Sequence, residues 1–322
     1  MKKIVLQLPL FLALGLVLTF NSCKKASPTT SADDSVSATD ATIVNTAADN
    51  ISNDASVASD QTSQISRSTN SGSAWTTICG ATVDTSSGSI VITYDGSTSC
   101  SGFTRTGTVT ITRASDSAWS QANSQVLIAI NVTATVVGTG SKYTLTGNDT
   151  ITNETGGLVY KVILGQSAGP VNRRYSGSMQ ITLPAGGART WTYDRTISWT
   201  NANSIISTSL YSEAPGNVAV TGTDRYGREF TSVYNTPIAD NDHLCTIGSF
   251  PAYIYAFPYA GKVTHTIGAN RTVTVQYGTD ASGAAVGGPG FCPSNFTSYG
   301  VYISYNNNKT GVAANLFLPY WW

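Results

Sequence analysis

Strict alternation of side-chain type at a period of two residues is the feature that most constrains how this chain folds. Threonine occupies every even position from Thr104 to Thr112, and the odd positions hold Arg105, Gly107, Val109 and Ile111. Residues 190–200 alternate in the same way between polar side chains and Trp191, Tyr193, Arg195, Ile197 and Trp199. Successive side chains of a strand point to opposite faces, whereas at helical spacing the same residues would scatter around the axis. Both runs are therefore predicted strands.

Further alternating runs extend this prediction over residues 74–322. They lie at residues 90–94, 126–136, 263–267, 273–277 and 301–305, with turn-forming Gly, Pro, Asp and Asn residues between them. The pattern predicts an all-β fold of antiparallel meanders and hairpins, packed as a sandwich or as a strongly curved sheet. We expect no amphipathic helix after the first 22 residues. The length allows one large domain or two similar halves, residues 74–235 and 236–322.

Residues 1–22 have the layout of an export signal. Lys2 and Lys3 give a positive start, residues 4–20 are almost wholly apolar, and two polar residues lead to Cys23. A transmembrane anchor is the alternative, but the apolar run is short for a span of about 20 residues and contains a glutamine and a proline. We therefore expect the segment to be cleaved.

Because it ends on a cysteine, this segment resembles a bacterial lipoprotein signal. The resemblance implies that Cys23 becomes the lipidated first residue of the mature protein, although Phe20-Asn21-Ser22 stands where Leu-Ala-Gly would be typical. More than one acyl chain, palmitate among them, makes such an attachment stable. The expected location is the cell envelope, at the outer membrane, on either its periplasmic or its surface face. The expected membrane partner is reached through the lipid on Cys23.

Residues 23–73 differ in composition from the rest of the chain. After the cysteine they are rich in Ser, Thr, Ala, Asn and Asp, and residues 24–73 contain no aromatic side chain. Such a stretch buries too little apolar surface to offset its ordering entropy. We therefore predict a flexible tether, with a reach of about 40 Å by random-coil scaling.

The cysteine count fits an exported protein. Without Cys23, four of the five cysteines remain, and an even number in an oxidising compartment favours disulfides over a zinc site, because no Cys-x-x-Cys spacing occurs. Four cysteines allow three pairings. Pairing of nearest neighbours is predicted because each loop closes locally, which gives Cys79–Cys100 and Cys245–Cys292.

An internal echo suggests the two similar halves. Residues 89–96 form a strand and a Tyr/Gly turn before Cys100 and a further strand, and residues 271–278 do the same before Cys292. In both halves a cysteine also precedes the first of these strands. Together with the lipoprotein start at Cys23, the pattern resembles a group of uncharacterised, β-rich lipoproteins common in Bacteroidota. The resemblance brings no known activity with it.

Composition and motifs exclude several function classes. Only 11% of residues are charged, with 18 basic against 18 acidic side chains, so no basic patch favours a nucleic-acid partner. The two histidines, His243 and His265, have no Gly-x-Ser-x-Gly motif to pair with, and His265 is expected to be a partly buried packing residue. The stretch Asp240 to His243 is expected to be a solvated turn, since it lacks the glycine and distal glutamate of a calcium loop. We predict no catalytic residue, metal site or cofactor.

Three aromatic side chains on one predicted strand face are the candidate binding residues: Trp191, Tyr193 and Trp199. Flat rings in a row stack on sugars, but they equally fill a core. The leading interpretation is a lipid-anchored envelope β-protein with a structural or interaction role and an envelope protein as its partner. The alternative is a surface glycan-binding lipoprotein that uses this aromatic face, and an envelope hydrolase is a second alternative.

Overall fold

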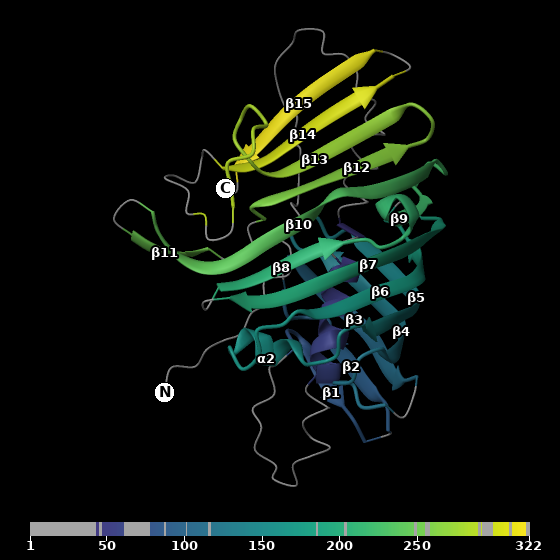
Figure 1. Cartoon of the computed structure of the whole chain (residues 1–322). Coiled ribbons are helices and arrows are strands. Elements are labelled where there is room, and N and C mark those ends of the chain that lie inside the picture. The colour runs from purple at the N-terminus through teal and green to yellow at the C-terminus, as the bar shows by residue number, and fades with distance from the viewer. Residues whose placement is uncertain are drawn as a thin grey trace. The chain divides into compact units, whose positions relative to one another are not determined.

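The computed structural model describes residues 43–44, 47–60, 78–86, 88–100, 102–114, 117–184, 186–202, 205–247, 250–254, 258–288, 291, 299–308 and 311–319. Over these residues the chain is mostly antiparallel β-sheet built from meander hairpins, which confirms the predicted all-β class (Figure 1). Cys23 and most of the predicted tether lie outside the described residues.

The described residues divide into two compact units, residues 47–206 and residues 207–319. The boundary predicted between Asn235 and Thr236 falls instead inside a single strand, β10 (Glu229–Ile247). This strand pairs with β9 (Val218–Thr223) on one side and β12 (Ala260–Ile267) on the other. The pairing with β12 runs from Phe230 to Ala239 and so keeps the residues on either side of position 235 in one unit.

The first unit is a sequential antiparallel meander, in which each strand pairs with the next along the chain. Its strands are β1 (Ala81–Asp84), β2 (Ile90–Asp95), β3 (Phe103–Arg113), β4 (Ser124–Val136), β5 (Lys142–Asn153), β6 (Val171–Thr182) and β7 (Ala188–Ala202). A short helix, α2 (Val159–Ile163), connects β5 to β6. The predicted alternation holds in β3, where Val109 and Ile111 are buried and Thr108, Thr110 and Thr112 are not.

Residues 47–60 form a helix, which we call the N-terminal helix (purple in Figure 1). The predicted flexible tether is therefore wrong for these residues, as is the expectation that no helix follows residue 22. No residue of the helix is fully exposed, and its alanines and Ile51 are at most 4% exposed. Its small side chains are almost completely covered, because the helix lies against side chains of the sheet such as Tyr94 and Arg105. Composition alone therefore underestimated what this segment buries.

The second unit is organised around β10. This strand pairs with β9, β11 and β12, and the meander continues from β12 through the last three strands. The elements not yet given are β8 (Ile205–Tyr211), η1 (Pro215–Asn217), β11 (Phe250–Ile254), β13 (Arg271–Thr279), β14 (Gly300–Asn307) and β15 (Val312–Pro319).

The sequence echo has a local structural counterpart in the turns after β2 and β13. The Asp95 carboxylate accepts hydrogen bonds from the backbone N–H groups of Ser97 and Thr98, at 2.7 and 2.8 Å. The Asp280 carboxylate accepts from the N–H groups of Ser282 and Ala284, at 2.8 and 3.0 Å. Hydrogen bonds to the ionised carboxylate lower the pKa of Asp95 to about 2, with the Thr98 hydroxyl making the largest contribution. Each unit thus uses a capped turn at this point of the echo.

Gly107 allows β3 and β4 to approach closely at the middle of the first unit. Its φ is +107°, and a Cβ added there would lie 2.1 Å from the carbonyl oxygen of Asn131 on β4. Gly102 is a matched glycine at the start of the same hairpin, with a φ of +82° and nothing within 4 Å of an added Cβ.

We predict that Gly107→Ala lowers the free energy of unfolding by several kcal/mol, because backbone strain of about 1–3 kcal/mol adds to a clash with a strand neighbour. Gly102→Ala should lose only the strain contribution, about 1–2 kcal/mol. Urea unfolding of both variants measures the difference. Equal losses in the two variants would show that the close approach at Gly107 does not matter.

Candidate functional site

The N-terminal helix meets the inner face of the first unit through three ion pairs, which we call the helix–sheet clamp. They join Asp49 to Arg195 on β7, Asp54 to Arg105 on β3, and Asp60 to Arg173 on β6. The aspartates are five and six residues apart. At 3.6 residues per turn, Asp54 points to a different side of the helix from the other two. A flat sheet does not reach both sides, so strands β3 to β7 must curve around the helix.

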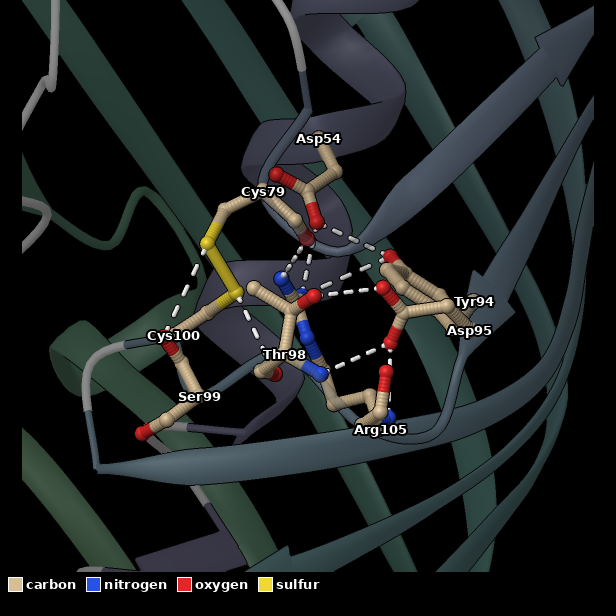
Figure 2. The surroundings of a disulfide bond; sticks show 9 residues. Asp54, Cys79, Tyr94, Asp95, Thr98, Ser99, Cys100 and Arg105 are labelled. Atoms are coloured by element: carbon tan, nitrogen blue, oxygen red, sulfur yellow. Dashed lines mark hydrogen bonds and ion pairs between the residues drawn. A yellow bond between two sulfur atoms is a disulfide. The ribbon is translucent and has the colours of Figure 1, made fainter.

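Figure 2 shows the Asp54 part of the clamp. The Asp54 carboxylate accepts a hydrogen bond from the Arg105 guanidinium at 2.6 Å and from the Tyr94 hydroxyl at 2.9 Å. The guanidinium carbon lies 4.4 Å from the centre of the Tyr94 ring, and a second N–H donates to the Cys79 carbonyl oxygen at 3.3 Å. Arg105 is thus held by a carboxylate, a ring face and a backbone carbonyl at once.

A disulfide lies directly beside this group (Figure 2). As predicted, Cys79 is bonded to Cys100, with an S–S distance of 2.08 Å and the two Cα atoms 6.0 Å apart. The bond joins the segment before β1 to the turn before β3 and so fixes the Cys79 carbonyl next to Arg105. A loop of this length contributes about 3 kcal/mol in the chain-entropy model. Cys292 lies outside the described residues, so the Cys245–Cys292 pairing stays a prediction.

The Asp60 part of the clamp is the most deeply buried. One carboxylate oxygen of Asp60 accepts from the Trp119 indole N–H at 2.7 Å and from Arg173 at 3.0 Å, and the other accepts from the backbone N–H of Val159 at 2.8 Å. Arg173 has no exposed side-chain surface and lies 4.4 Å over the Trp119 ring. The end of the N-terminal helix is therefore tied to the start of α2 as well as to the sheet.

In the Asp49 part of the clamp, two carboxyl groups, of Asp49 and Asp149, interact with one arginine, Arg195. Arg195 pairs with Asp49 and lies 5.3 Å from the centre of the Tyr193 ring, but Asp149 on β5 faces the same group and is 2% exposed. Burial raises the pKa of Asp149 to about 7, and the opposing effects of Tyr193, Arg195 and Ser52 do not cancel it. Two carboxyl groups thus share one guanidinium between the helix and the sheet.

A single pattern recurs in all three parts: an aspartate of the helix, an arginine of the sheet and an aromatic ring beneath the arginine. Burial raises the pKa of each helix aspartate, and the paired arginine opposes that rise. A buried pair adds little net stability over an apolar one, yet breaking it leaves an uncompensated charge. The clamp therefore acts mainly by specifying where along the sheet the helix binds.

The aromatic row on β7 belongs to the core. Trp191, Tyr193 and Trp199 are 3, 5 and 2% exposed. A stacking platform for a glycan needs exposed ring faces, so the interpretation of these rings as binding residues is wrong. They occupy the inner-face positions of β7, on the side that receives the helix, and Tyr193 supports Arg195 there.

The remaining candidate residues lie in the second unit. His265 is half-buried on β12 as expected, its Nδ1 is 2.8 Å from the Ser232 hydroxyl, and burial lowers its pKa to about 4. Asp240 and His243 lie inside β10, not in a solvated turn, and the Asp240 carboxylate is 6% exposed and accepts from the Thr208 hydroxyl. Among the described residues, no group of three or more His, Cys, Asp or Glu side chains gathers as a metal site would require.

Sequence reasoning missed the helix–sheet clamp, although a signal for it was present. Arg105 and Arg195 occupy inner-face positions in otherwise apolar or aromatic alternating runs. An arginine on a buried strand face requires a buried carboxylate partner. The aspartates of residues 47–60 were candidates for these partners, because they stand among small Ala and Ser side chains that fit against a sheet.

Comparison with known proteins finds no family model, no curated protein and no solved structure that matches this chain.

We predict that Asp54→Ala lowers the free energy of unfolding by about 3–5 kcal/mol, because it leaves the Arg105 charge buried beside Tyr94. Replacing both partners by apolar residues, Asp54→Leu with Arg105→Met, should recover most of that loss. The matched control is Asp194→Ala, which breaks the partly exposed pair with Arg174 and should lose at most about 1 kcal/mol. Urea unfolding measures all three, and equal losses for Asp54→Ala and Asp194→Ala would contradict the clamp.

For the aromatic row, Trp191→Ala should lower the free energy of unfolding by about 3–5 kcal/mol, since it leaves a cavity in the core. Leu127→Ala on β4, where the side chain is 49% exposed, is the control and should change stability little. A Trp191→Ala protein that keeps its thermal stability but loses retention on a glycan column would restore the platform interpretation.

Proposed function

We propose that this chain is a lipid-anchored β-protein of the cell envelope with a structural or interaction role, whose attachment segment is built into its fold. The observation that supports the proposal best is the helix–sheet clamp. The chain that leads away from Cys23 reaches the N-terminal helix at residue 47, and this helix is buried against the sheet by three ion pairs. A tether that simply held a domain near a membrane would need no such burial.

The helix–sheet clamp would allow the N-terminal helix to transmit a mechanical force to the sheet. A force applied at the lipidated end passes along residues 24–46 into the N-terminal helix. From there it reaches β3, β6 and β7 through the paired arginines. Load is thus shared among several strands of the meander.

Two further observations support an envelope location. The Cys79–Cys100 bond suits an oxidising compartment, where disulfides form and persist. The leader with Cys23 resembles a lipoprotein signal, and the chain resembles β-rich lipoproteins of Bacteroidota. Within the part of the chain that the structure describes, none of the helices combines the length and apolar character that crossing a membrane demands.

The test replaces the cysteine on which attachment depends. Cys23→Ala should abolish incorporation of an alkyne-tagged palmitate analogue and move the protein out of the washed membrane fraction. Ser22→Ala, one residue earlier, is the matched control and should be labelled and sedimented like the unaltered chain. Continued membrane fractionation of Cys23→Ala with normal cleavage after residue 22 would overturn the lipid anchor.

A further inference from the structure

Asp149 and Asp49 face the same guanidinium from opposite sides of the helix–sheet interface. Asp49 comes from the N-terminal helix, Asp149 comes from β5, and Arg195 comes from β7 two strands away. Both acids are shielded from solvent, at 17% and 2% exposure. With a single arginine between them, only one of the two carboxyl groups has a counter-charge. The other is accommodated at low energy only while it carries a proton.

Within the described ranges, Arg195 is the cation that acts on the Asp149 carboxyl, and the other neighbours are neutral. Across the strands, Asp149 is paired with Ile128 on β4 and Gly177 on β6, and an added Cβ at Gly177 would lie 2.9 Å from the Asp149 carboxylate. Tyr193 on β7 and Ser52 on the helix face the carboxyl with neutral hydroxyl groups. Tyr175 on β6 is nearby in the same interface, and burial raises its pKa to about 12, so it stays neutral at ordinary pH.

We propose that docking of the N-terminal helix is a proton-dependent device, in which a protonated Asp149 leaves Arg195 to Asp49 and an ionised Asp149 competes for it. The inference concerns the fold itself and goes beyond the proposed anchoring function. When the helix is docked and Asp149 is neutral, the Asp49 part of the clamp holds one carboxylate and one guanidinium. When Asp149 ionises, a second carboxylate is buried beside Asp49. The docked helix is then weakened at its first turns, while Asp60 retains its own arginine.

The direction of the pH dependence follows from the two states. With the helix undocked, Asp149 reaches solvent and its pKa returns toward 3.8, whereas with the helix docked it is about 7. Below about pH 4 both states hold the proton, and docking is strongest. Between about pH 4 and 7 only the docked state holds it, so each pH unit weakens docking by up to about tenfold. Above pH 7 neither state holds it, and the dependence levels off.

The other acids of the clamp act in the same direction. Burial raises the pKa of Asp49, Asp54 and Asp60, so their protonation also favours the docked state. Asp54 pairs with Arg105 and Asp60 with Arg173, and no other acid among the described residues forms an ion pair with either arginine. A substitution at Asp149 therefore measures how much of the pH dependence of helix docking comes from this residue.

The test is hydrogen–deuterium exchange of the full-length, detergent-solubilised protein between pH 4.5 and 8.5, with protection factors corrected for the intrinsic exchange rate. Protection of peptides from residues 47–60 should fall from pH 5 to 7, and Asp149 should account for up to about tenfold of that fall per pH unit. Peptides from β3 and β4 should keep their protection over the same range. Asp149→Asn, which keeps the shape but does not titrate, should flatten much of the fall.

Two further variants separate the device from simpler explanations. Asp49→Asn frees Arg195 to pair with Asp149, so the fall in helix protection should shift to lower pH. Asp194→Asn removes a carboxylate from the outer face of the same strand, β7, and should leave the profile of the unaltered chain unchanged. An unchanged slope in Asp149→Asn would overturn the proposal. So would a loss of protection that occurs in β3 and β4 at the same pH as in the helix, because the helix would then not open separately.

Discussion

Burial of charge on the inner face of the first unit is the constraint on which the rest of this structure depends. Three arginines on β3, β6 and β7 point to the side of the sheet that elsewhere holds valine, isoleucine and tryptophan. Without counter-charges such a face would not close over a core. The N-terminal helix supplies the carboxylates, and aromatic rings under each guanidinium fill the space around it. The position of the helix and the composition of the core thus both follow from the need to pair the buried arginines.

The same arrangement explains why a segment without aromatic residues folds. Residues 47–60 contribute little apolar area of their own, and their alanines and serines are nevertheless almost completely covered. The helix is covered by side chains that are remote in sequence, such as Tyr94 and Arg105 of the sheet. The ion pairs then fix which turn of the helix meets which strand, because a displacement by one residue would separate every pair.

Much of the fold could be predicted from the sequence because a strand is visible in the alternation of neighbouring side chains. The threonine ladder from Thr104 to Thr112 identified β3, and alternation from Trp191 to Trp199 identified β7, since period two has only one structural reading. The Cys79–Cys100 bond followed from short-range loop closure. The N-terminal helix did not follow, because its stability lies in residues that are remote in sequence. Asp60 and Arg173 are separated by 113 positions, and no local pattern connects them.

That separation has a consequence for how the molecule assembles. The N-terminal helix precedes all of the strands that receive it, so it leaves the ribosome before its binding surface exists. Contacts of such long range form slowly, since the chain between them must first be ordered. We expect β2 to β7 to pair first and the helix to enter last, as the final step that completes the core. Until then the three arginines of the sheet face water, so their charges stay hydrated and the apolar inner surface between them is interrupted by polar groups.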